Sequence, residues 1–302
     1  MKLVITPRSL KSRKFPITLD FDGSPSEVRV EDVQAAIAKQ FPQLYPDRQR
    51  LTLDKTALET EKTLQDYGIK DGDSVTFKDL GPQISWRTVF LIEYGGPLVI
   101  HPLIYYLPSL IYGETFEHSW MQTITYGMVM LHFLKREYET VFVHRFSHGT
   151  MPFRNVFKNS AHYHLLSGLN LAYWVYGPWN AAGATLAKRS DVLVYGCIAL
   201  YIFAEVSNFH THVTLRNLRP PGTRVRKVPR GYGFDLVSCP NYFFETLAWL
   251  AISVLTMSWS AYLFFVVAVG QMYIWSVKKH RGYRKDFTDY PRGRKAMFPF
   301  VA

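Results

Sequence analysis

The feature that most constrains this chain is one long apolar run near its C-terminal end. Residues 241–277 include a single charged side chain, Glu245. An α-helix needs about 20 mostly apolar residues to cross the roughly 30 Å hydrocarbon core of a bilayer. The run is therefore long enough for two spans, with a turn near residues 257–260. A large water-soluble helical core does not readily explain two adjacent apolar stretches that share one charge, so the run predicts a multi-pass membrane protein.

Four further apolar stretches lie upstream of this run, at residues 86–112, 118–133, 164–179 and 192–209. The first contains Gly95-Gly96-Pro97, a sequence that can break a helix. Tryptophan and tyrosine gather near the ends of the stretches, as is typical of side chains at a membrane interface. We therefore predict an α-helical membrane domain over residues 80–302, with six transmembrane helices, or seven if the first stretch is split.

The N-terminal part differs from the rest in charge and in pattern. Residues 1–80 carry 13 basic and 13 acidic side chains, so the net charge of +11 belongs to the remainder. Alternation of apolar and polar residues predicts strands, and three- and four-residue apolar spacing predicts a helix. The strands are expected at 2–7, 15–20, 51–53 and 74–77, and the helix at 30–41. This order resembles the ubiquitin-like β-grasp fold, and we predict an α+β ubiquitin-like domain over residues 1–79 that serves in folding or interaction.

The positive charge of the C-terminal part is concentrated in two segments. Residues 213–230 contain six basic side chains and no acid, and residues 278–295 contain eight basic side chains and two acids. The positive-inside rule places both segments, and the C-terminus, on the cytosolic side. Lipid headgroups are expected partners of such segments. No base-stacking or groove-reading module accompanies the charge, so we expect no nucleic-acid partner.

Metal chemistry is poorly supported by the sequence. The two cysteines, Cys197 and Cys239, belong to no CxxC pair, which excludes a thiolate zinc site of that kind. His144 and His148 are four residues apart and could begin a di-iron histidine box. Membrane oxygenases need further boxes with adjacent histidines, and this chain has no adjacent histidine pair. We therefore predict that the protein holds no metal.

Nucleotide binding is expected, but not through a common loop motif. Neither a GxGxxG nor a GxxxxGK[ST] sequence occurs. Several arginines in cytosolic loops nevertheless suit a ligand with several phosphates, because guanidinium groups pair bidentately with phosphate. NADPH and an acyl-CoA both fit that description, and contact with lipid alone is the alternative.

Three ordered segments carry a more specific signal. They are Leu-Arg-Asn-Leu-Arg at 215–219, Ser-Cys-Pro-Asn-Tyr-Phe-Phe-Glu at 238–245, and Lys-His-Arg-Gly-Tyr-Arg-Lys-Asp-Phe at 279–287. These segments resemble the C-terminal region of the steroid 5α-reductase family. Within that family, residues 81–86 and 142–152, together with the ubiquitin-like N-terminus, are similar to the very-long-chain trans-2-enoyl-CoA reductases. The resemblance covers essentially the whole chain.

The resemblance implies the last reduction of each fatty-acid elongation cycle, carried out with NADPH in the endoplasmic reticulum membrane. Hydride would go to the β-carbon of a long or very long trans-2-enoyl-CoA, and Tyr242 would protonate the α-carbon, with Lys135 as its electrostatic partner. The residues implied for substrate binding are Gln83, Glu93, His144 and His148. Those implied for NADPH are Asn208, His212, Arg216, Arg219, Asn241, Glu245, Arg281 and Tyr283.

Two alternatives remain open at this stage. The first is a related reductase that acts on a 3-oxo-Δ4 steroid or a polyprenol, although steroid reductases carry an apolar aromatic residue at the position of Tyr242 and a tyrosine near that of Lys135. The second is a non-enzymatic scaffold of the endoplasmic reticulum that uses the ubiquitin-like domain to recruit partners. For an enoyl-CoA reductase, other enzymes of the elongation cycle are further expected partners.

Overall fold

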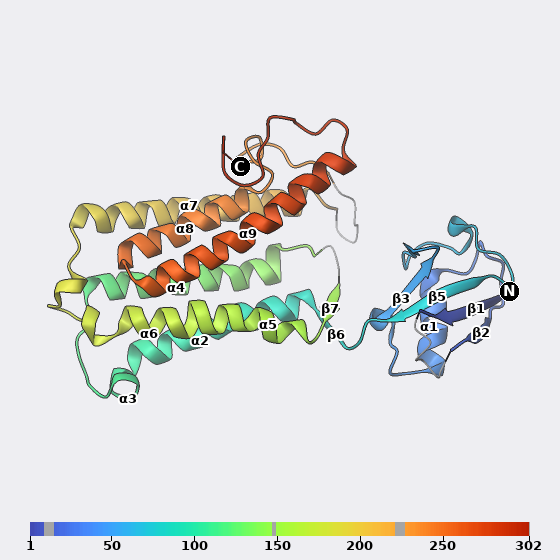
Figure 1. Cartoon of the computed structure of the whole chain (residues 1–302), viewed down its shortest axis with the longest axis horizontal. Coiled ribbons are helices and arrows are strands. Elements are labelled where there is room, and N and C mark those ends of the chain that lie inside the picture. The colour runs from blue at the N-terminus through green and yellow to red at the C-terminus, as the bar shows by residue number, and fades with distance from the viewer. Residues whose placement is uncertain (9–14, 147–148, 221–226, 302) are drawn as a thin grey trace. The chain divides into compact units, whose positions relative to one another are not determined.

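The computed structural model describes residues 1–8, 15–146, 149–220 and 227–301 (Figure 1). The chain forms two compact units. The first comprises Met1–Ser85 with the short segment Gly149–Asn155, and the second comprises Trp86–His148 with Val156–Ala302. The short segment joins the first unit because β7 (Thr150–Pro152) pairs antiparallel with β6 (Gln83–Ser85).

The first unit contains a mixed sheet with strand order β2-β1-β5-β3-β4. Strand β1 (Lys2–Pro7) pairs antiparallel with β2 (Ile17–Asp20) and parallel with β5 (Ser74–Asp79). Strand β5 also pairs antiparallel with β3 (Gln49–Leu53), which in turn pairs with the short β4 (Thr56–Ala57). The four strands predicted from alternation are therefore confirmed, and β4 is an addition too short to give a pattern.

Helix α1 (Val30–Gln40) packs its apolar face on this sheet. Val33 and Ile37 are fully buried in one cluster with the inward-facing residues of β1 and β5. At the start of the helix the Asp32 carboxylate accepts a hydrogen bond of 2.8 Å from the backbone N–H of Arg29, which satisfies a donor that the helix leaves unpaired. The arrangement of one helix on a mixed sheet is the predicted β-grasp arrangement.

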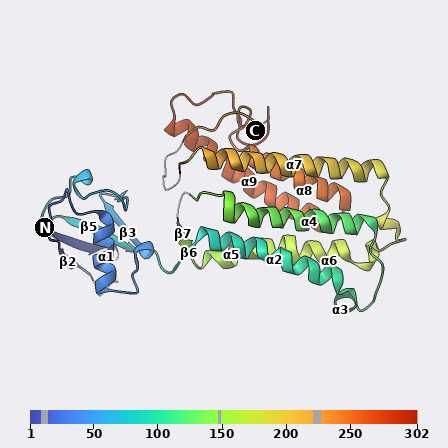
Figure 2. The ribbon, with the colours of Figure 1, turned by 180° about the vertical axis from the view of Figure 1, so that it is seen from behind.

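The second unit is helical (Figures 1 and 2). Its long helices are α2 (Trp86–Tyr106), α4 (Trp120–Tyr138), α7 (Asp191–Asn217), α8 (Pro240–Thr256) and α9 (Trp259–Asp286). Helix α7 packs along α8, which packs along α9, and α2 packs against α4. The predicted turn in the long apolar run is confirmed, because α8 ends at Thr256 and Met257 adopts a left-handed conformation with φ of 50°.

A further helical rod lies beside α2 and consists of three consecutive pieces. These are α5 (Asn155–Ala161), a π-helical segment (His162–Asn170) and α6 (Leu171–Tyr176). A short helix, α3 (Pro108–Tyr112), follows α2. Helix α2 itself continues through Gly95-Gly96-Pro97 without a break, so the described residues give no sign of the split that would make a seventh span.

In the described part of the chain, three helices are each long and apolar enough to cross a membrane: α2, α7 and α9. Helices α4 and α8 run with them in the same bundle, but α4 carries several buried polar side chains and α8 has 17 residues. The total number of spans therefore stays a prediction.

Close approach between α2 and the π-helical segment depends on a glycine. The Nε2 atom of His164 lies 2.8 Å from the carbonyl oxygen of Ile92, to which it donates a hydrogen bond. A Cβ atom at Gly96 would lie 2.1 Å from Cδ2 of His164. Any side chain at position 96 must therefore displace the imidazole ring.

We predict that Gly96→Ala lowers the thermal stability of the detergent-solubilised protein. Overpacking a close contact costs about 1–3 kcal/mol, and here it also breaks the hydrogen bond to Ile92. The matched control is Gly127→Ala in α4, where no described atom lies within 4 Å of the added methyl group. Equal unfolding temperatures for the two variants would show that the contact does not hold α2 in place.

Candidate active site

Polar side chains at helical spacing line the faces where α4, α7 and α8 meet. Positions three, four and seven apart share one face of a helix, and each of the three helices carries such a set. The members are His132, Lys135, Arg136 and Glu139 from α4 and the turn after it, Glu205, Asn208 and His212 from α7, and Asn241 and Glu245 from α8. The structure thus gathers five predicted site residues (Lys135, Asn208, His212, Asn241 and Glu245) in one buried cluster.

Lys135 is held by α7. Its Nζ atom lies 2.6 Å from a carboxylate oxygen of Glu205 and donates a hydrogen bond of 2.5 Å to Oδ1 of Asn208. The Asn208 amide in turn donates to the carbonyl oxygen of Asn241 at 2.8 Å and to Glu245 at 3.1 Å. One lysine and one asparagine therefore link three helices through hydrogen bonds and an ion pair.

His132 lies between two carboxylates. Its Nδ1 atom is 2.6 Å from Glu205, and its Nε2 atom is 3.3 Å from Glu245. The imidazole is almost completely buried. Buried carboxylates are costly unless they are paired, so His132 and Lys135 together make it possible to keep two acids inside the bundle.

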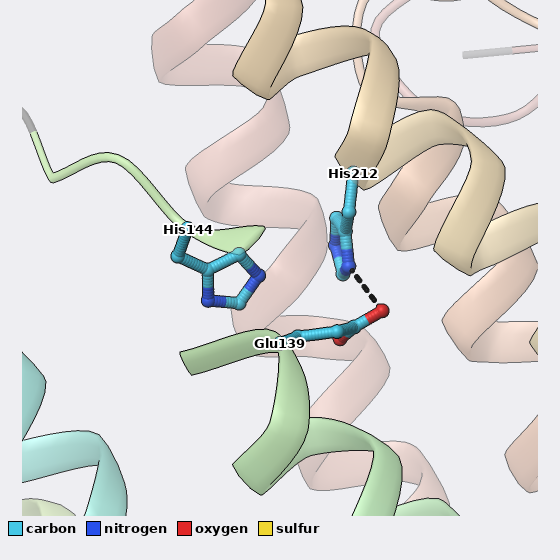
Figure 3. Close-up of side chains that lie close together, drawn as sticks. All are labelled: Glu139, His144 and His212. Atoms are coloured by element: carbon cyan, nitrogen blue, oxygen red, sulfur yellow. Dashed lines mark ion pairs between the residues drawn. The ribbon is translucent and has the colours of Figure 1, made fainter. Parts of the chain in front are cut away.

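A second group of charges lies one turn further along α4. Arg136 donates hydrogen bonds to Glu139 at 2.8 Å and to the hydroxyl of Tyr94 at 2.6 Å. The other carboxylate oxygen of Glu139 lies 3.0 Å from Nδ1 of His212, as Figure 3 shows. The ring of His144, from the segment after α4, lies 5.0 Å from that of His212.

The trio Glu139, His144 and His212 offers three potential metal ligands within 4.8 Å of one another (Figure 3). The surrounding charge does not favour a cation there, because Arg136 contacts Glu139 at 2.8 Å and Lys135 lies 3.7 Å from it. Burial, together with Arg136, lowers the pKa of His144 to about 2, so its imidazole is neutral at physiological pH. We interpret the trio as a hydrogen-bonding group that faces a ligand, and the expectation that no metal binds stays a prediction.

Tyr242 does not join this cluster through Lys135. Its ring lies at the first turn of α8, with the ring centroid 6.4 Å from that of Trp275 and 5.1 Å from Nζ of Lys279. Among the described residues, no hydrogen bond or ring contact connects Tyr242 with Lys135. The two residues that the resemblance paired are therefore engaged with different partners.

The other predicted substrate residues lie in several places. Gln83 belongs to the first unit, where its side-chain amide donates to the carbonyl oxygens of Leu80 and Gly81 at 3.2 and 3.1 Å. Glu93 is buried in α2, and only 2% of its surface is exposed. His148 lies outside the described residues.

The predicted arginines extend the cluster past the end of α7. Arg145 donates hydrogen bonds to the carbonyl oxygens of Arg216 and Arg219, and Arg219 donates to that of Arg145 at 3.2 Å. Arg281 and Tyr283 lie near the C-terminal end of α9, where the ring of Tyr283 stacks on that of Tyr290. The predicted arginines thus occur near helix ends, whereas Lys135 and Arg136 lie with the acids inside the bundle.

The predicted site residues did not include His132, Arg136, Glu139, Glu205 or Lys279, all of which the structure places in or beside the site. For the first four, the signal was available as polar residues at helical spacing within otherwise apolar segments. For Lys279 no such signal exists, because it is one of eight basic residues in a single segment.

We predict that Glu139→Ala strongly destabilises the protein, because Arg136 and His212 would lose a buried carboxylate. Removing one partner of a buried ion pair costs about 3–5 kcal/mol. Thermal unfolding in detergent measures the effect, with Glu114→Ala in an exposed segment as the control. The double variant Arg136→Met/Glu139→Met should recover part of the loss, and an unchanged unfolding temperature in Glu139→Ala would contradict the ion-pair assignment.

Two family models match this chain. The model described as 3-oxo-5-alpha-steroid 4-dehydrogenase matches residues 149–302, and the ubiquitin family model matches residues 5–77. The second match agrees with the β-grasp fold of the first unit.

Individual relatives cover nearly the whole chain. A Schizosaccharomyces pombe protein described as an enoyl reductase is 48% identical over 303 residues, which is 99% of each chain. The very-long-chain enoyl-CoA reductase of Dictyostelium discoideum is 44% identical over 81% of this chain and 80% of its own. A human trans-2,3-enoyl-CoA reductase-like protein is 30% identical over 90% of this chain and 77% of its own. The chain therefore belongs to the 3-oxo-5-alpha-steroid 4-dehydrogenase family, within its group of enoyl-CoA reductases, which are oxidoreductases that act on CH–CH groups.

Proposed function

We propose that this protein reduces long-chain and very-long-chain trans-2-enoyl-CoA to saturated acyl-CoA with NADPH, as the last step of the elongation cycle. The observation that carries the proposal is the position of Tyr242. Its phenol lies on the first turn of α8, one residue from Asn241, whose carbonyl oxygen is bonded to the buried Lys135–Asn208 pair. A proton donor therefore lies next to a preorganised polar cluster inside an apolar bundle.

The residues of the cluster fit a nicotinamide dinucleotide, which the reduction of an enoyl-CoA requires in general. One buried polar atom of the cluster, Nε of Arg136, has no hydrogen-bond partner among the described residues. Such an atom is costly to leave unpaired, and a ligand with carboxamide and hydroxyl groups would satisfy it. When bound, NADPH supplies the hydride for the β-carbon.

The roles proposed for this chain's residues follow their positions. Asn208, His212, Asn241 and Glu245 would hold the polar parts of the cofactor inside the bundle. Arg216, Arg219, Arg281 and Tyr283 would hold its phosphates and adenine ribose at the helix ends, where guanidinium groups suit phosphate. Within the helical unit, Glu93 and His144 would contact the acyl-CoA, and the substrate roles of Gln83 and His148 stay predictions from the resemblance.

Tyr242 would supply the second hydrogen. Its phenol O–H can donate a proton to the α-carbon as the enolate collapses. Lys135 is the proposed electrostatic support of the site, and its ion pair with Glu205 suggests that it acts by fixing Asn208 rather than by touching the phenol.

The proposed topology has six spans in the endoplasmic reticulum membrane: α2, α4, the rod from α5 to α6, α7, α8 and α9. The basic segments and the C-terminus would be cytosolic, beside lipid headgroups. The proposed domains are the ubiquitin-like domain at residues 1–79 and the reductase domain at 80–302. The ubiquitin-like domain is a candidate contact for other elongation enzymes.

We predict that Tyr242→Phe lowers turnover with trans-2-enoyl-CoA by about 10²–10⁴-fold, the usual contribution of a general acid. Binding of NADPH, measured by calorimetry, should not change, because the phenyl ring is kept. Tyr195→Phe is the control, since that side chain is 63% exposed on α7. Full activity of Tyr242→Phe would exclude the tyrosine as proton donor, and reduction of a 3-oxo-Δ4 steroid in preference to the enoyl-CoA would favour the alternative substrate.

We also predict that Arg216→Met weakens NADPH binding by roughly 10–100-fold, since a hydrogen bond to a charged group is worth about 1.5–3 kcal/mol. Binding of NADPH by titration calorimetry measures this. Lys188→Met, which removes an exposed positive charge just before the opposite end of α7, is the control for net charge. If both variants bind NADPH as the unmodified protein does, Arg216 contacts lipid or CoA instead.

A further inference from the structure

Lys279 lies beside the ring of Tyr242, and neither the family resemblance nor the relatives give it a role. It lies on α9, two turns before the end of that helix. Its Nζ atom is 5.1 Å from the centroid of the Tyr242 ring, and its ammonium group interacts electrostatically with the phenol. The contact joins α8 to α9 at the level of the proposed proton donor.

The two lysines near the site differ in how their charge is neutralised. Lys135 lies 2.6 Å from Glu205 and 3.7 Å from Glu139, so two carboxylates share its charge. Lys279 has no carboxylate partner in the part of the chain that the structure describes. Only Lys279 can therefore offer an uncompensated positive charge to a new anion beside it.

Two other titratable side chains of the described residues, Cys239 and Tyr283, interact with Lys279, and neither is a carboxylate. Burial raises the pKa of the Cys239 thiol to about 11, against the opposing effect of Lys279, so the thiol is neutral at physiological pH. Tyr283 stacks with Tyr290. The phenolate that Tyr242 would become is thus the anion that this ammonium is placed to stabilise.

We propose that Lys279 is a positioning residue for Tyr242: it orients the phenol and stabilises the phenolate left after proton transfer. The inference rests on the proposed function. In the reaction, the O–H bond of Tyr242 breaks and a C–H bond forms at the α-carbon, whose electron pair comes from the enolate. The negative charge then resides on the phenolate beside the ammonium until a proton from solvent restores the phenol.

The neighbouring Lys278 provides a matched control. Successive residues of an α-helix point about 100° apart, because one turn takes 3.6 residues, so Lys278 lies on a different face of α9. Both lysines are exposed, and the same substitution at either position removes the same charge from the same helix end. Any general effect of charge on membrane insertion or on cofactor attraction is therefore common to both positions.

The test uses the full-length protein in detergent with Lys279→Met, Lys279→Arg and Lys278→Met. We expect Lys279→Met to lower kcat by about 10²–10³-fold, the usual loss when one stabiliser of a developing anion is removed. The Kd for NADPH and the KM for the enoyl-CoA should stay unchanged. Lys279→Arg should keep most of the turnover, and Lys278→Met should resemble the unmodified protein.

The deciding readout is the solvent deuterium isotope effect on kcat. Proton transfer becomes more rate-limiting when the phenolate loses its stabilising charge, so the effect should rise in Lys279→Met and not in Lys279→Arg. A purely structural role would reduce the active fraction and leave the isotope effect unchanged, and that result would overturn the inference. So would a kcat for Lys279→Met equal to that of Lys278→Met.

Failure of the inference is distinguishable from failure of the proposed function. If Tyr242→Phe is inactive and Lys279→Met is fully active, the tyrosine acts without Lys279, and only the inference is overturned. If Tyr242→Phe retains full activity, the proposed proton donor is wrong and the inference falls with it.

Discussion

The buried ion pairs between α4, α7 and α8 are the interaction on which the rest of the helical unit depends. Glu205 and Glu245 lie among apolar side chains, where an unpaired carboxylate is unfavourable. They are accommodated because His132 lies between them and Lys135 pairs with Glu205. These contacts fix the rotation of three helices about their axes. They therefore also determine where Asn208 and the first turn of α8 lie.

The same contacts divide the cations of the site into two groups: those that are paired with carboxylates and those that have no carboxylate partner among the described residues. Lys135 and Arg136 are both engaged with carboxylates inside the bundle. Lys279 and Arg216, near helix ends, have no carboxylate partner in the described part of the chain. A cation that already has a partner positions its neighbours, whereas one without a partner can respond to an anion that arrives or forms. On this basis we propose that the buried lysine organises the site and that the lysine of α9 supports the proton donor.

Much of the fold could be predicted from sequence because its signals are local. Alternation identified β1, β2, β3 and β5, helical spacing identified α1, and hydropathy located the turn at Met257. The number of transmembrane spans was harder to predict from hydropathy, since α4 is a long helix that also carries buried polar residues. The pairing of β6 with β7 joins residues far apart in sequence, and the pattern within a single segment does not indicate which strand it pairs with.

For the candidate site, the sequence allowed us to name residues but not the contacts between them. The family's motifs include Asn208, His212, Asn241 and Glu245, which the structure gathers in one region, but the motifs do not indicate which lysine faces Tyr242. The lysine that faces Tyr242 is determined by the packing of α8 against α9, which sequence spacing does not encode.

The central claim is that a hydride reaches the β-carbon and Tyr242 protonates the α-carbon. Reduction of a trans-2-enoyl-CoA with NADPH deuterated at the transferred position, and separately in D₂O, tests it by mass spectrometry and NMR of the product. The account predicts that deuterium from the cofactor appears only at the β-carbon and deuterium from the solvent only at the α-carbon. Solvent deuterium at the β-carbon, or the absence of a saturated product, would contradict it.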